Sequence, residues 1–346
     1  MMENRIPNSY CFDDVLLVPK YSDIQSRKEV DLSTSVPRLH TTIGLPIVSS
    51  PMDTVTEDGM AAAMASLGGL GIIHRYNSIE EQCGLVESAY RISPLSVIGA
   101  AVGVTGDYEE RAVSLYDSGA SVICVDIAHG HHMLMRTALE NLRKRLGDKA
   151  HIMAGNVATL EGFNALSDWG ADSIRVGIGG GSICSTRIQT GHGMPTLYSI
   201  MQCSKSDRDS LLVADGGIRT SGDIVKCLAA GADIVMLGSM LAGTDESPGD
   251  IIHIPKTGEA VKSYRGMASV EAQIDWRGHT SSVEGVSTTV GYKGSVKDII
   301  MSLDNGIRSG LSYSGCRSVS ELQASAQFIR QSSLGATESS THILNK

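Results

Sequence analysis

The sequence predicts a (β/α)8 barrel, in which eight parallel strands alternate with eight helices. Short apolar runs rich in β-branched residues recur between residues 45 and 245, and amphipathic stretches of helical period separate them. Polar residues gather directly after those runs, at the ends where this fold places its active site. An open, doubly wound sheet is the competing architecture. We favour the barrel because the runs form eight units and because polar residues follow so many of them.

The expected strands are nearly continuous apolar runs, as is typical of parallel strands covered on both faces. The helical stretches carry start and stop signals, such as Thr159 before one helix and Gly170 or Gly231 after another. Gly-Ala pairs recur where a helix ends and the next strand begins, so the βα unit repeats within the chain. Strands are expected at residues 45–50, 69–74, 96–104, 121–127, 151–157, 173–178, 211–215 and 233–237, with clear helices at 108–118, 133–146, 160–169 and 221–230.

Residues 1–330 are expected to form a single catalytic barrel domain. Within it, residues 1–44 would be an amino-terminal extension and residues 247–300 an insertion after the eighth strand. The middle of that insertion, about residues 268–284, is polar and punctuated by glycine, which indicates a mobile lid. Residues 331–346 are polar and are expected to form a flexible tail.

The composition argues against several classes of partner. The 346 residues carry a net charge of −9 without a long basic run, which disfavours nucleic acid and anionic membranes. No apolar window reaches the length of a membrane span, and the first residues lack the apolar core of a signal peptide. The seven cysteines are dispersed and never form a CxxC pair. They indicate free thiols in a reducing cytoplasm rather than a disulfide frame or a zinc site.

Cys184 is the strongest candidate for a catalytic group. It follows a glycine-rich run that begins at Gly177, and glycines let a ligand come close to the backbone. Thr186 and Arg187 follow at once and could move a proton and support an anionic sulfur. A buried thiol that only packs is the alternative. We favour a nucleophile because apolar packing does not require a glycine-rich approach beside polar groups.

Two glycine motifs after the last two strands indicate a phosphate site. One ends at Gly217, after the seventh strand, and the other is formed by Gly238 and Ser239, after the eighth. Loops at these positions of a barrel often hold a phosphate on backbone N–H groups. A simple chain reversal is the alternative for either motif alone, and the occurrence of both at adjacent strand ends favours the phosphate.

Other polar side chains are expected at the same end of the barrel. Ser182 and Tyr264 could add hydroxyl donors, and the carboxylate of Asp215 suits a ribose diol better than a phosphate. Asp126 begins a loop that also holds three histidines, and Asn156 follows the next strand. We interpret that histidine loop as facing a ligand rather than holding a metal, because no second cluster supplies further metal ligands.

Glu284 closes the expected lid. A carboxylate that returns to a site holding a hydroxyl and a thiol could take part in proton transfer. A solvated loop carboxylate is the alternative from the local sequence alone.

Six segments together resemble the IMP dehydrogenase/GMP reductase family, and the resemblance covers residues 8 to about 330. It implies a (β/α)8 barrel, usually a homotetramer, that binds a purine nucleotide and a nicotinamide dinucleotide. It also implies a thiol that attacks C2 of the purine and forms a covalent intermediate. The segments are residues 12–19 (FDDVLLVP), 50–56 (SPMDTVT), 177–187 (GIGGGSICSTR), 214–218 (ADGGI), 236–239 (MLGS) and 264–267 (YRGM).

The resemblance also implies roles for individual residues. Cys184 matches the nucleophile, and Thr186 and Glu284 match the proton-transfer pair. Residues matching the family's nucleotide site are Ser50, Met52, Ser182, Asp215, Gly217, Gly238, Ser239, Tyr264, Gly266 and Met267, and those matching its dinucleotide site are Asp126, Ile127, Ala128, Asn156 and Gly177.

The resemblance further implies a monovalent cation, such as potassium, held by backbone carbonyls of the thiol loop. Gly177, Gly179 and Cys184 match those positions. The chain departs from the family at Gly180, where proline is usual.

Within the family, the sequence favours a GMP reductase, which would use NADPH to deaminate GMP reductively to IMP and ammonia. The paired regulatory module that dehydrogenases typically insert after the second strand is absent, and the segment between Gly266 and Glu284 is short. Arg277 precedes Gly278, whereas dehydrogenases carry an Arg-Tyr pair that activates water. Residues 328–330 also resemble reductases. Residues 50–56 and the pair 238–239 look more like dehydrogenases, so an IMP dehydrogenase without the module is the alternative.

Two other classes of function are also open. A nucleotide sensor on this fold would not need Cys184, Thr186 and Glu284 together. A flavin-dependent barrel oxidoreductase could share the phosphate loops but would not need this thiol loop, and an absorbance spectrum would distinguish it.

Overall fold

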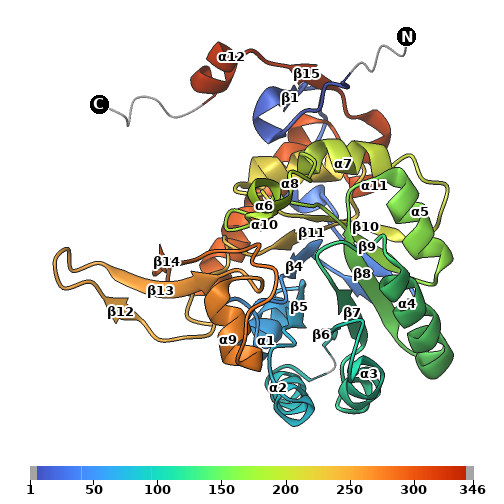
Figure 1. Cartoon of the computed structure of the whole chain (residues 1–346). Helices are drawn as coiled ribbons and strands as arrows, with labels where there is room; N and C mark the ends of the chain where they lie inside the picture. The colour runs from blue at the N-terminus through green and yellow to red at the C-terminus, as the bar shows by residue number, and fades with distance from the viewer. Residues whose placement is uncertain (1–5, 40, 95, 340–346) are drawn as a thin grey trace.

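The computed structural model describes residues 6–39, 41–94 and 96–339. At its centre eight parallel strands form a closed barrel in the order β10-β11-β4-β5-β6-β7-β8-β9 (Figure 1). Every strand lies within one of the runs predicted from the sequence, so the (β/α)8 prediction is confirmed. The strands are β4 (Ile47–Ser49), β5 (Leu70–Ile73), β6 (Ile98–Val102), β7 (Val122–Asp126), β8 (His151–Val157), β9 (Ser173–Val176), β10 (Leu211–Asp215) and β11 (Ile234–Leu237).

Helices surround the barrel, and several begin at the expected capping residues. The hydroxyl of Thr159 accepts the N–H of Gly162, and that of Thr220 accepts the N–H of Asp223. In the described part of the chain, no helix combines the length and apolarity needed to cross a membrane. The outer helices are α1 (Asp58–Ser66), α2 (Ile79–Ile92), α3 (Tyr108–Asp117), α4 (Met133–Leu146), α5 (Leu160–Asp168), α7 (Thr196–Cys203), α8 (Ser221–Ala229) and α10 (Val296–Tyr313).

The interior of the barrel is filled by side chains that alternate along the strands. Ile72, Cys124 and Met153 belong to this inner cluster, and a larger cluster packs the outer faces of the strands against the helices. The hairpin of β2 (Thr34–Val36) and β3 (Thr41–Ile43) adds Val36 and Ile43 to the inner cluster. The amino-terminal end of the barrel is therefore closed by apolar side chains, and ligands can reach the strands only from the opposite end.

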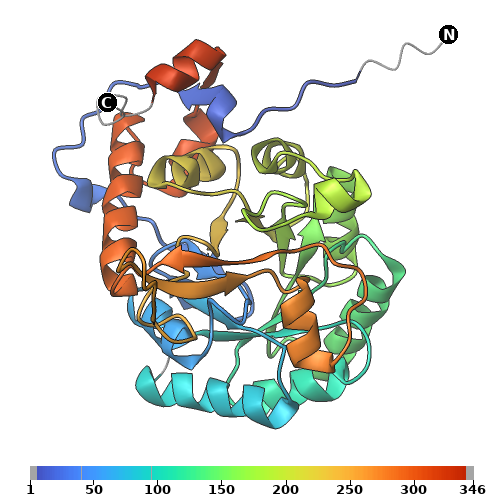
Figure 2. The ribbon, with the colours of Figure 1, turned by 60° about the vertical axis from the view of Figure 1, so that its left-hand side comes forward.

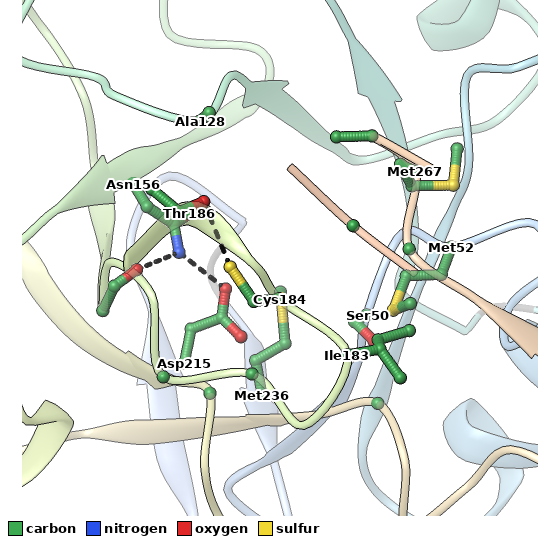
Figure 3. A pocket seen from close by; sticks show the side chains of 18 of the residues that line it. Ser50, Met52, Ala128, Asn156, Ile183, Cys184, Thr186, Asp215, Met236 and Met267 are labelled. Carbon is green, nitrogen blue, oxygen red and sulfur yellow. Dashed lines mark hydrogen bonds between the residues drawn. The ribbon is translucent and has the colours of Figure 1, made fainter. Parts of the chain in front are cut away.

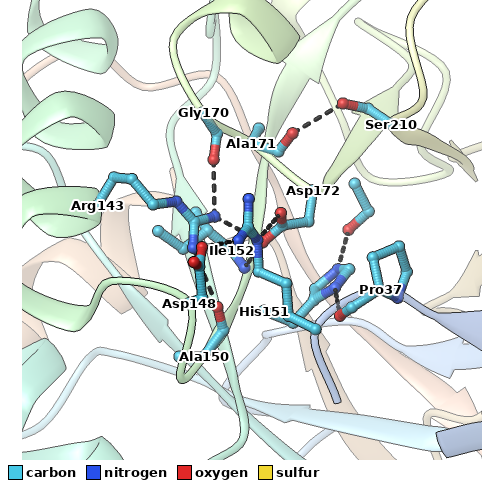
Figure 4. A network of polar contacts seen from close by, with 12 residues as sticks. Pro37, Arg143, Asp148, Ala150, His151, Ile152, Gly170, Ala171, Asp172 and Ser210 are labelled. Carbon is cyan, nitrogen blue, oxygen red and sulfur yellow. Dashed lines mark hydrogen bonds and ion pairs between the residues drawn. The ribbon is translucent and has the colours of Figure 1, made fainter. Parts of the chain in front are cut away.

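A polar network ties the hairpin region to the amino-terminal ends of β8 and β9 (Figure 4). The carboxylate of Asp172 accepts from both Arg38 and Arg143 and from the N–H of Ile152. Arg143 also donates to the carbonyl of Gly170 at 2.8 Å. The nearly buried Asp172 carboxylate therefore has two guanidinium partners, which offsets its desolvation.

His151 lies beside this network and is almost fully buried. Its Nδ1 is 3.1 Å from the carbonyl oxygen of Pro37, and its Nε2 is 2.7 Å from the hydroxyl of Ser173 (Figure 4). A carbonyl can only accept, so Nδ1 carries the proton and Nε2 accepts from Ser173. Burial lowers the pKa of His151, and the neutral imidazole satisfies both contacts.

The insertion after β11 forms a small antiparallel sheet and one helix. The sheet contains β12 (Ile252–His253), β13 (Ala260–Arg265) and β14 (Ser287–Gly291), and helix α9 (Val270–Arg277) lies between β13 and β14 in sequence. Figure 2 shows the long orange strands of this sheet crossing beside the barrel, with α9 next to them. The expected boundary at residue 300 was too late, because α10 begins at Val296. The segment predicted to be a lid therefore contains a helix that its weak periodicity did not predict.

A strand from the amino-terminal part of the chain pairs with one from the carboxyl-terminal part. Strand β1 (Val15–Leu17) pairs antiparallel with β15 (Phe328–Arg330), which follows α11 (Val319–Ser325). Short 3₁₀ helices η1 (Phe12–Asp14) and η2 (Arg27–Glu29) lie on either side of β1. Within the tail that was expected to be flexible, residues 333–338 form helix α12 (Ser333–Glu338), and residues 340–346 lie outside the described residues.

Candidate active site

A cavity of about 370 Å³ opens at the carboxyl-terminal ends of the barrel strands. Loops after β4, β5, β7, β9, β10 and β11 line it, together with Asn156 on β8 and the ends of the inserted segment (Figure 3). Every residue that the family resemblance matched to the nucleotide, the dinucleotide, the cation or catalysis lines this cavity. The structure therefore brings together side chains that are far apart in the sequence.

Cys184 lies in the loop after β9, just before the short helix α6 (Thr186–Thr190). Its Sγ is 3.2 Å from Oγ1 of Thr186, and that hydroxyl donates to Oε2 of Glu284 at 2.8 Å. Because Thr186 gives its proton to the carboxylate, its oxygen is free to accept the thiol proton. A thiol, a hydroxyl and a carboxylate thus form a continuous hydrogen-bonded series.

The backbone fixes Glu284 beside the thiol loop. Cys184 and Gly285 form an antiparallel bridge. The N–H of Ser185 donates to the carbonyl of Glu284 at 2.8 Å, and the N–H of Val286 donates to the carbonyl of Ile183 at 3.1 Å. These contacts do not involve the Glu284 side chain, so the carboxylate is held in place by main-chain pairing.

Gly177 lets the thiol loop approach the loop after β10. Its φ is +152°, and a Cβ at this position would lie 1.8 Å from the carbonyl oxygen of Asp215. No side chain fits in that space. The close approach places the carboxylate of Asp215 against the loop that carries Cys184.

A buried arginine, which the sequence analysis missed, joins two of the expected site carboxylates. Arg175 on β9 donates to Asp126 at 2.5 Å and to Oδ2 of Asp215 at 2.9 Å. Asn156 also donates to Oδ2 of Asp215, at 2.8 Å (Figure 3). The two carboxylates hold the pKa of Arg175 well above its usual value, against the effect of its desolvation. Oδ1 of Asp215 accepts no hydrogen bond from the described residues and is free to accept from a ligand.

Backbone N–H groups gather at the other end of the cavity. Among the residues that the structure covers, those of Gly217, Gly238 and Ser239 have no protein acceptor. The hydroxyl of Tyr264 lies beside them, and burial raises its pKa while hydrogen bonds with Ser182 and Ser239 oppose that rise. Unpaired N–H groups and hydroxyls are the donors that a phosphate dianion requires.

An apolar wall lies between the two polar ends. Met52, Ile183, Met236 and Met267 line this part of the cavity (Figure 3). Flexible thioether side chains make a surface on which a flat ring can pack.

Arg187 and the histidine loop after β7 do not take part in the hydrogen-bonded series of the thiol. Arg187 packs its side chain against Gly179 and Gly193 and donates to the carbonyl of Met194, and it does not line the cavity, so its contacts do not support the suggested role beside an anionic sulfur. Across the described ranges, no group of three or more His, Cys, Asp or Glu side chains is placed to hold a metal ion, and this includes the histidine loop after β7.

A second cavity, of about 210 Å³, shares Arg75, Tyr76 and Ile127 with the first. The rings of Tyr76 and Trp276 stack there at 4.2 Å with a 10° angle between their planes. Arg75, Arg111 and Arg277 line this cavity, and Arg75 lies over both rings. The Trp-Arg pair in an otherwise polar segment was a signal that the sequence analysis did not use.

The fold and the hydrogen-bonded thiol define the class of protein, a (β/α)8 barrel with a thiol at the carboxyl ends of its strands. The model of the IMP dehydrogenase / GMP reductase domain matches residues 9–342. The chain therefore belongs to the IMP dehydrogenase/GMP reductase family, whose members are oxidoreductases that act on purine nucleotides.

Relatives of both kinds are similar over nearly the whole chain. The GMP reductase of Leishmania major is 33% identical over 486 positions, covering 99% of this chain and 98% of that protein. The inosine-5′-monophosphate dehydrogenase of Cryptosporidium parvum is 37% identical over 395 positions, covering 99% and 97%. A crystal structure of a cysteine-to-alanine variant of GMP reductase from Trypanosoma brucei in complex with guanosine 5′-monophosphate has a TM-score of 0.91 and 33% identity, covering 98% of both chains.

The alignment lengths bear on the missing regulatory module. The alignment with the reductase from Leishmania extends over 486 positions, far more than the 346 residues of this chain, so it includes a long segment that this chain lacks. The alignment with the dehydrogenase from Cryptosporidium extends over only 395. Absence of a module therefore does not separate the two activities, and the distinction has to come from the lid.

Proposed function

We propose that this protein is a GMP reductase, which converts GMP, NADPH and protons to IMP, ammonium and NADP⁺. The hydrogen-bonded series from Cys184 through Thr186 to Glu284 carries the proposal. It provides a nucleophile and a proton acceptor that can later become a proton donor. The similar structure from Trypanosoma brucei holds GMP, which supports GMP as the nucleotide.

In the first proposed step, the proton of the Cys184 thiol passes to Thr186 while Thr186 gives its own proton to Glu284. The sulfur attacks C2 of GMP. Glu284 then returns a proton through Thr186 to the 2-amino group, which leaves as ammonia when the C2–N bond breaks. An S–C2 bond has replaced a C2–N bond, and the carboxylate is regenerated.

The second proposed step reduces the purine. NADPH, when bound, supplies a hydride to C2. The C2–S bond then breaks as IMP forms, its electron pair leaves on the Cys184 sulfur, and a proton from solvent restores the thiol. No water is consumed in this sequence, so the site needs no group that activates water.

The lid supports reduction over hydrolysis. Of its residues, only Ala268 and Glu284 line the main cavity. The guanidinium of Arg277 instead lines the second cavity and contacts Gln273 and Ser281. An IMP dehydrogenase, which would convert IMP, NAD⁺ and water to XMP and NADH, is the second candidate, favoured by the 37% identity to the Cryptosporidium dehydrogenase.

The nucleotide would bind across the main cavity. Its phosphate would accept hydrogen bonds from the free N–H groups of Gly217, Gly238 and Ser239. A ribose hydroxyl would donate to Oδ1 of Asp215. The base would pack on the apolar wall, with its C2 near Cys184.

We assign the dinucleotide to the side of the cavity lined by Asp126, Ile127, Ala128 and Asn156, which continues into the second cavity. The arginines there supply positive charge for the additional phosphate of NADPH. Nε of Arg75 is buried, lies 3.9 Å from Oδ2 of Asp126 and donates no hydrogen bond within the described part of the chain, so it can still donate to such a group.

A monovalent cation fits the thiol loop only in part. The carbonyls of Gly179 and Cys184 accept no hydrogen bond among the described residues, while that of Gly177 already accepts from Asn156. These three would hold the ion, and its charge would restrain the loop. A Cβ at Gly180 would lie 2.4 Å from Oγ1 of Thr196, so the family's proline would need a shift of that side chain.

The assembly and the lid complete the proposal. A homotetramer in the cytoplasm, with a lid at residues 268–284 that moves during turnover, would agree with the family resemblance.

A spectrophotometric assay tests the proposed function. Purified protein should consume NADPH when GMP is added, with release of ammonia and formation of IMP. Formation of NADH from IMP and NAD⁺, without consumption of NADPH in the presence of GMP, would show that the protein is a dehydrogenase.

A further inference from the structure

The loop after β11, which carries part of the proposed phosphate site, is joined to a distant segment that follows β14. The N–H of Lys293 donates to the carbonyl of Gly243 at 2.9 Å, and the N–H of Asp245 donates to the carbonyl of Gly294, also at 2.9 Å. Thr244 and Gly294 form a parallel bridge. Residues 293–294 therefore run alongside this loop and hold its far side.

The side chain of Lys293 reaches further along the same loop. Its Nζ donates to the carbonyl of Ser239 at 2.6 Å and to the carbonyl of Met240 at 3.1 Å. In the described part of the structure, Lys293 forms no ion pair with a carboxylate. An ammonium group on an exposed residue usually stays in water, so two short contacts to main-chain oxygens mark a directed interaction.

These contacts fix the direction of one peptide group. The peptide between Ser239 and Met240 is trans, and in a trans peptide the C=O and the following N–H point in opposite directions. The carbonyl of Ser239 points to Lys293, which does not line the cavity, whereas Ser239 does. The N–H of Met240 therefore points away from Lys293, and it has no acceptor among the described residues.

We propose that Lys293 is a positioning residue for the 5′-phosphate of the nucleotide. It holds the peptide group between Ser239 and Met240 so that the N–H of Met240 faces the phosphate, and it does so from behind, without contacting the ligand. Its contact to the carbonyl of Met240 only steadies the next peptide group, because the N–H of Leu241 already donates to the carbonyl of Gly238 at 3.0 Å. This inference rests on the phosphate site of the proposed function, but it does not depend on the direction of the reaction. A reductase and a dehydrogenase would both bind a nucleotide 5′-phosphate here.

The ammonium group acts on the loop in two ways. Its hydrogen bonds restrain the carbonyls against rotation, so the donors are in place before the phosphate arrives. Its charge also polarises the peptide group between Ser239 and Met240 toward a more positive N–H of Met240, which strengthens the bond to an anion. Both effects act on the hydrogen bonds to the phosphate, so they should not change the affinity for a nucleoside.

Equilibrium binding of GMP and guanosine, measured by isothermal titration calorimetry, tests this role. Lys293→Met should weaken GMP binding by about 10- to 100-fold, the worth of one hydrogen bond to a charged group. Guanosine affinity should change by less than about twofold, because it lacks the phosphate. Lys293→Arg keeps a cation and should retain most of the affinity for GMP.

Tyr292→Phe is the matched control. Tyr292 is the neighbouring residue and donates to Asp245 at 2.5 Å, but its hydroxyl does not contact residues 238–240. It should bind both ligands like the wild type. Thermal melting of each variant establishes whether it is folded. If Lys293→Met does not fold, Lys293→Arg still allows the test.

Three outcomes would overturn the inference. Lys293→Met with unchanged GMP affinity would remove the role of the ammonium group. Equal weakening for GMP and guanosine would show a general structural role. A wild-type protein that binds GMP no better than guanosine would refute the phosphate site itself, and the proposed function would fail with it.

Discussion

Replacing Glu284 by glutamine should separate the two halves of the proposed reaction. Its side chain accepts the hydroxyl proton of Thr186 at 2.8 Å, while its backbone is held by Ser185 and Ala268. Glu284→Gln keeps the size of the side chain and these main-chain contacts. It removes the carboxylate that takes up a proton through Thr186 when Cys184 loses its own. The same carboxylate returns a proton through Thr186 to the departing amino group.

The expected loss follows from that contact. A positioned acid or base contributes about 10²- to 10⁴-fold to a rate. This factor corresponds to about 3–5 kcal/mol in the activation free energy of ammonia release. Hydride transfer needs the dinucleotide against C2 but no leaving-group proton, so it should slow far less. GMP binding should be nearly unchanged, because the phosphate and ribose contacts lie on other loops.

Two measurements distinguish these steps. Rapid quench after mixing with GMP alone gives the rate of ammonia release, and mass spectrometry detects the covalent adduct. Single-turnover reaction with NADPH then gives the rate of reduction. Glu271→Gln is the matched control, because Glu271 lies on the same lid and accepts from Ser287 at 2.5 Å but does not line the cavity. If Glu284→Gln releases ammonia at the wild-type rate, the carboxylate takes no part in proton transfer and only holds the lid in place.

Three further predictions follow. Cys184→Ala should abolish turnover but preserve GMP binding in calorimetry, whereas Cys11→Ala, at an exposed cysteine, should keep full activity. Burial lowers the pKa of His151 in the folded protein, so the unfolded chain takes up the proton first, and urea titrations should show the free energy of unfolding falling as the pH drops below about 6.5. His151→Gln should reduce that dependence. Arg175→Met should lower the free energy of unfolding by about 3 kcal/mol in urea titrations, because it leaves two carboxylates unpaired, whereas Arg136→Met at the exposed ion pair with Glu140 should cost less than about 1 kcal/mol.

The barrel was predictable because its signal is local and repeated. Each strand is an apolar run of the right length, and residues such as Thr159 and Thr220 cap the following helix through contacts with the next few residues. Helix α9 was missed for the opposite reason. Its large apolar residues Val270, Ile274 and Trp276 are exposed and its buried positions are Ala272 and Gln273, so apolar residues do not form a buried stripe along it.

The residues of the cavity were predictable where their place after a strand is enough to locate them, since the carboxyl-terminal ends of barrel strands meet at one face. Cys184, Thr186 and Glu284 became a connected series only through the bridge between the thiol loop and Gly285, which the sequence could suggest only by family resemblance. Arg175 was hidden because it lies inside an apolar strand, and a charge there is explained only by partners from two other strands.

The pairing of β1 with β15 has a consequence for how the chain is made. Val15 emerges early from the ribosome, but its partner Arg330 emerges only when synthesis is almost complete. Throughout that time the edge of β1 has no strand to pair with, and exposed edges favour association between chains. The last ladder can therefore close only at the end of translation, and a nascent chain stalled before Phe328 should be the form most dependent on chaperones.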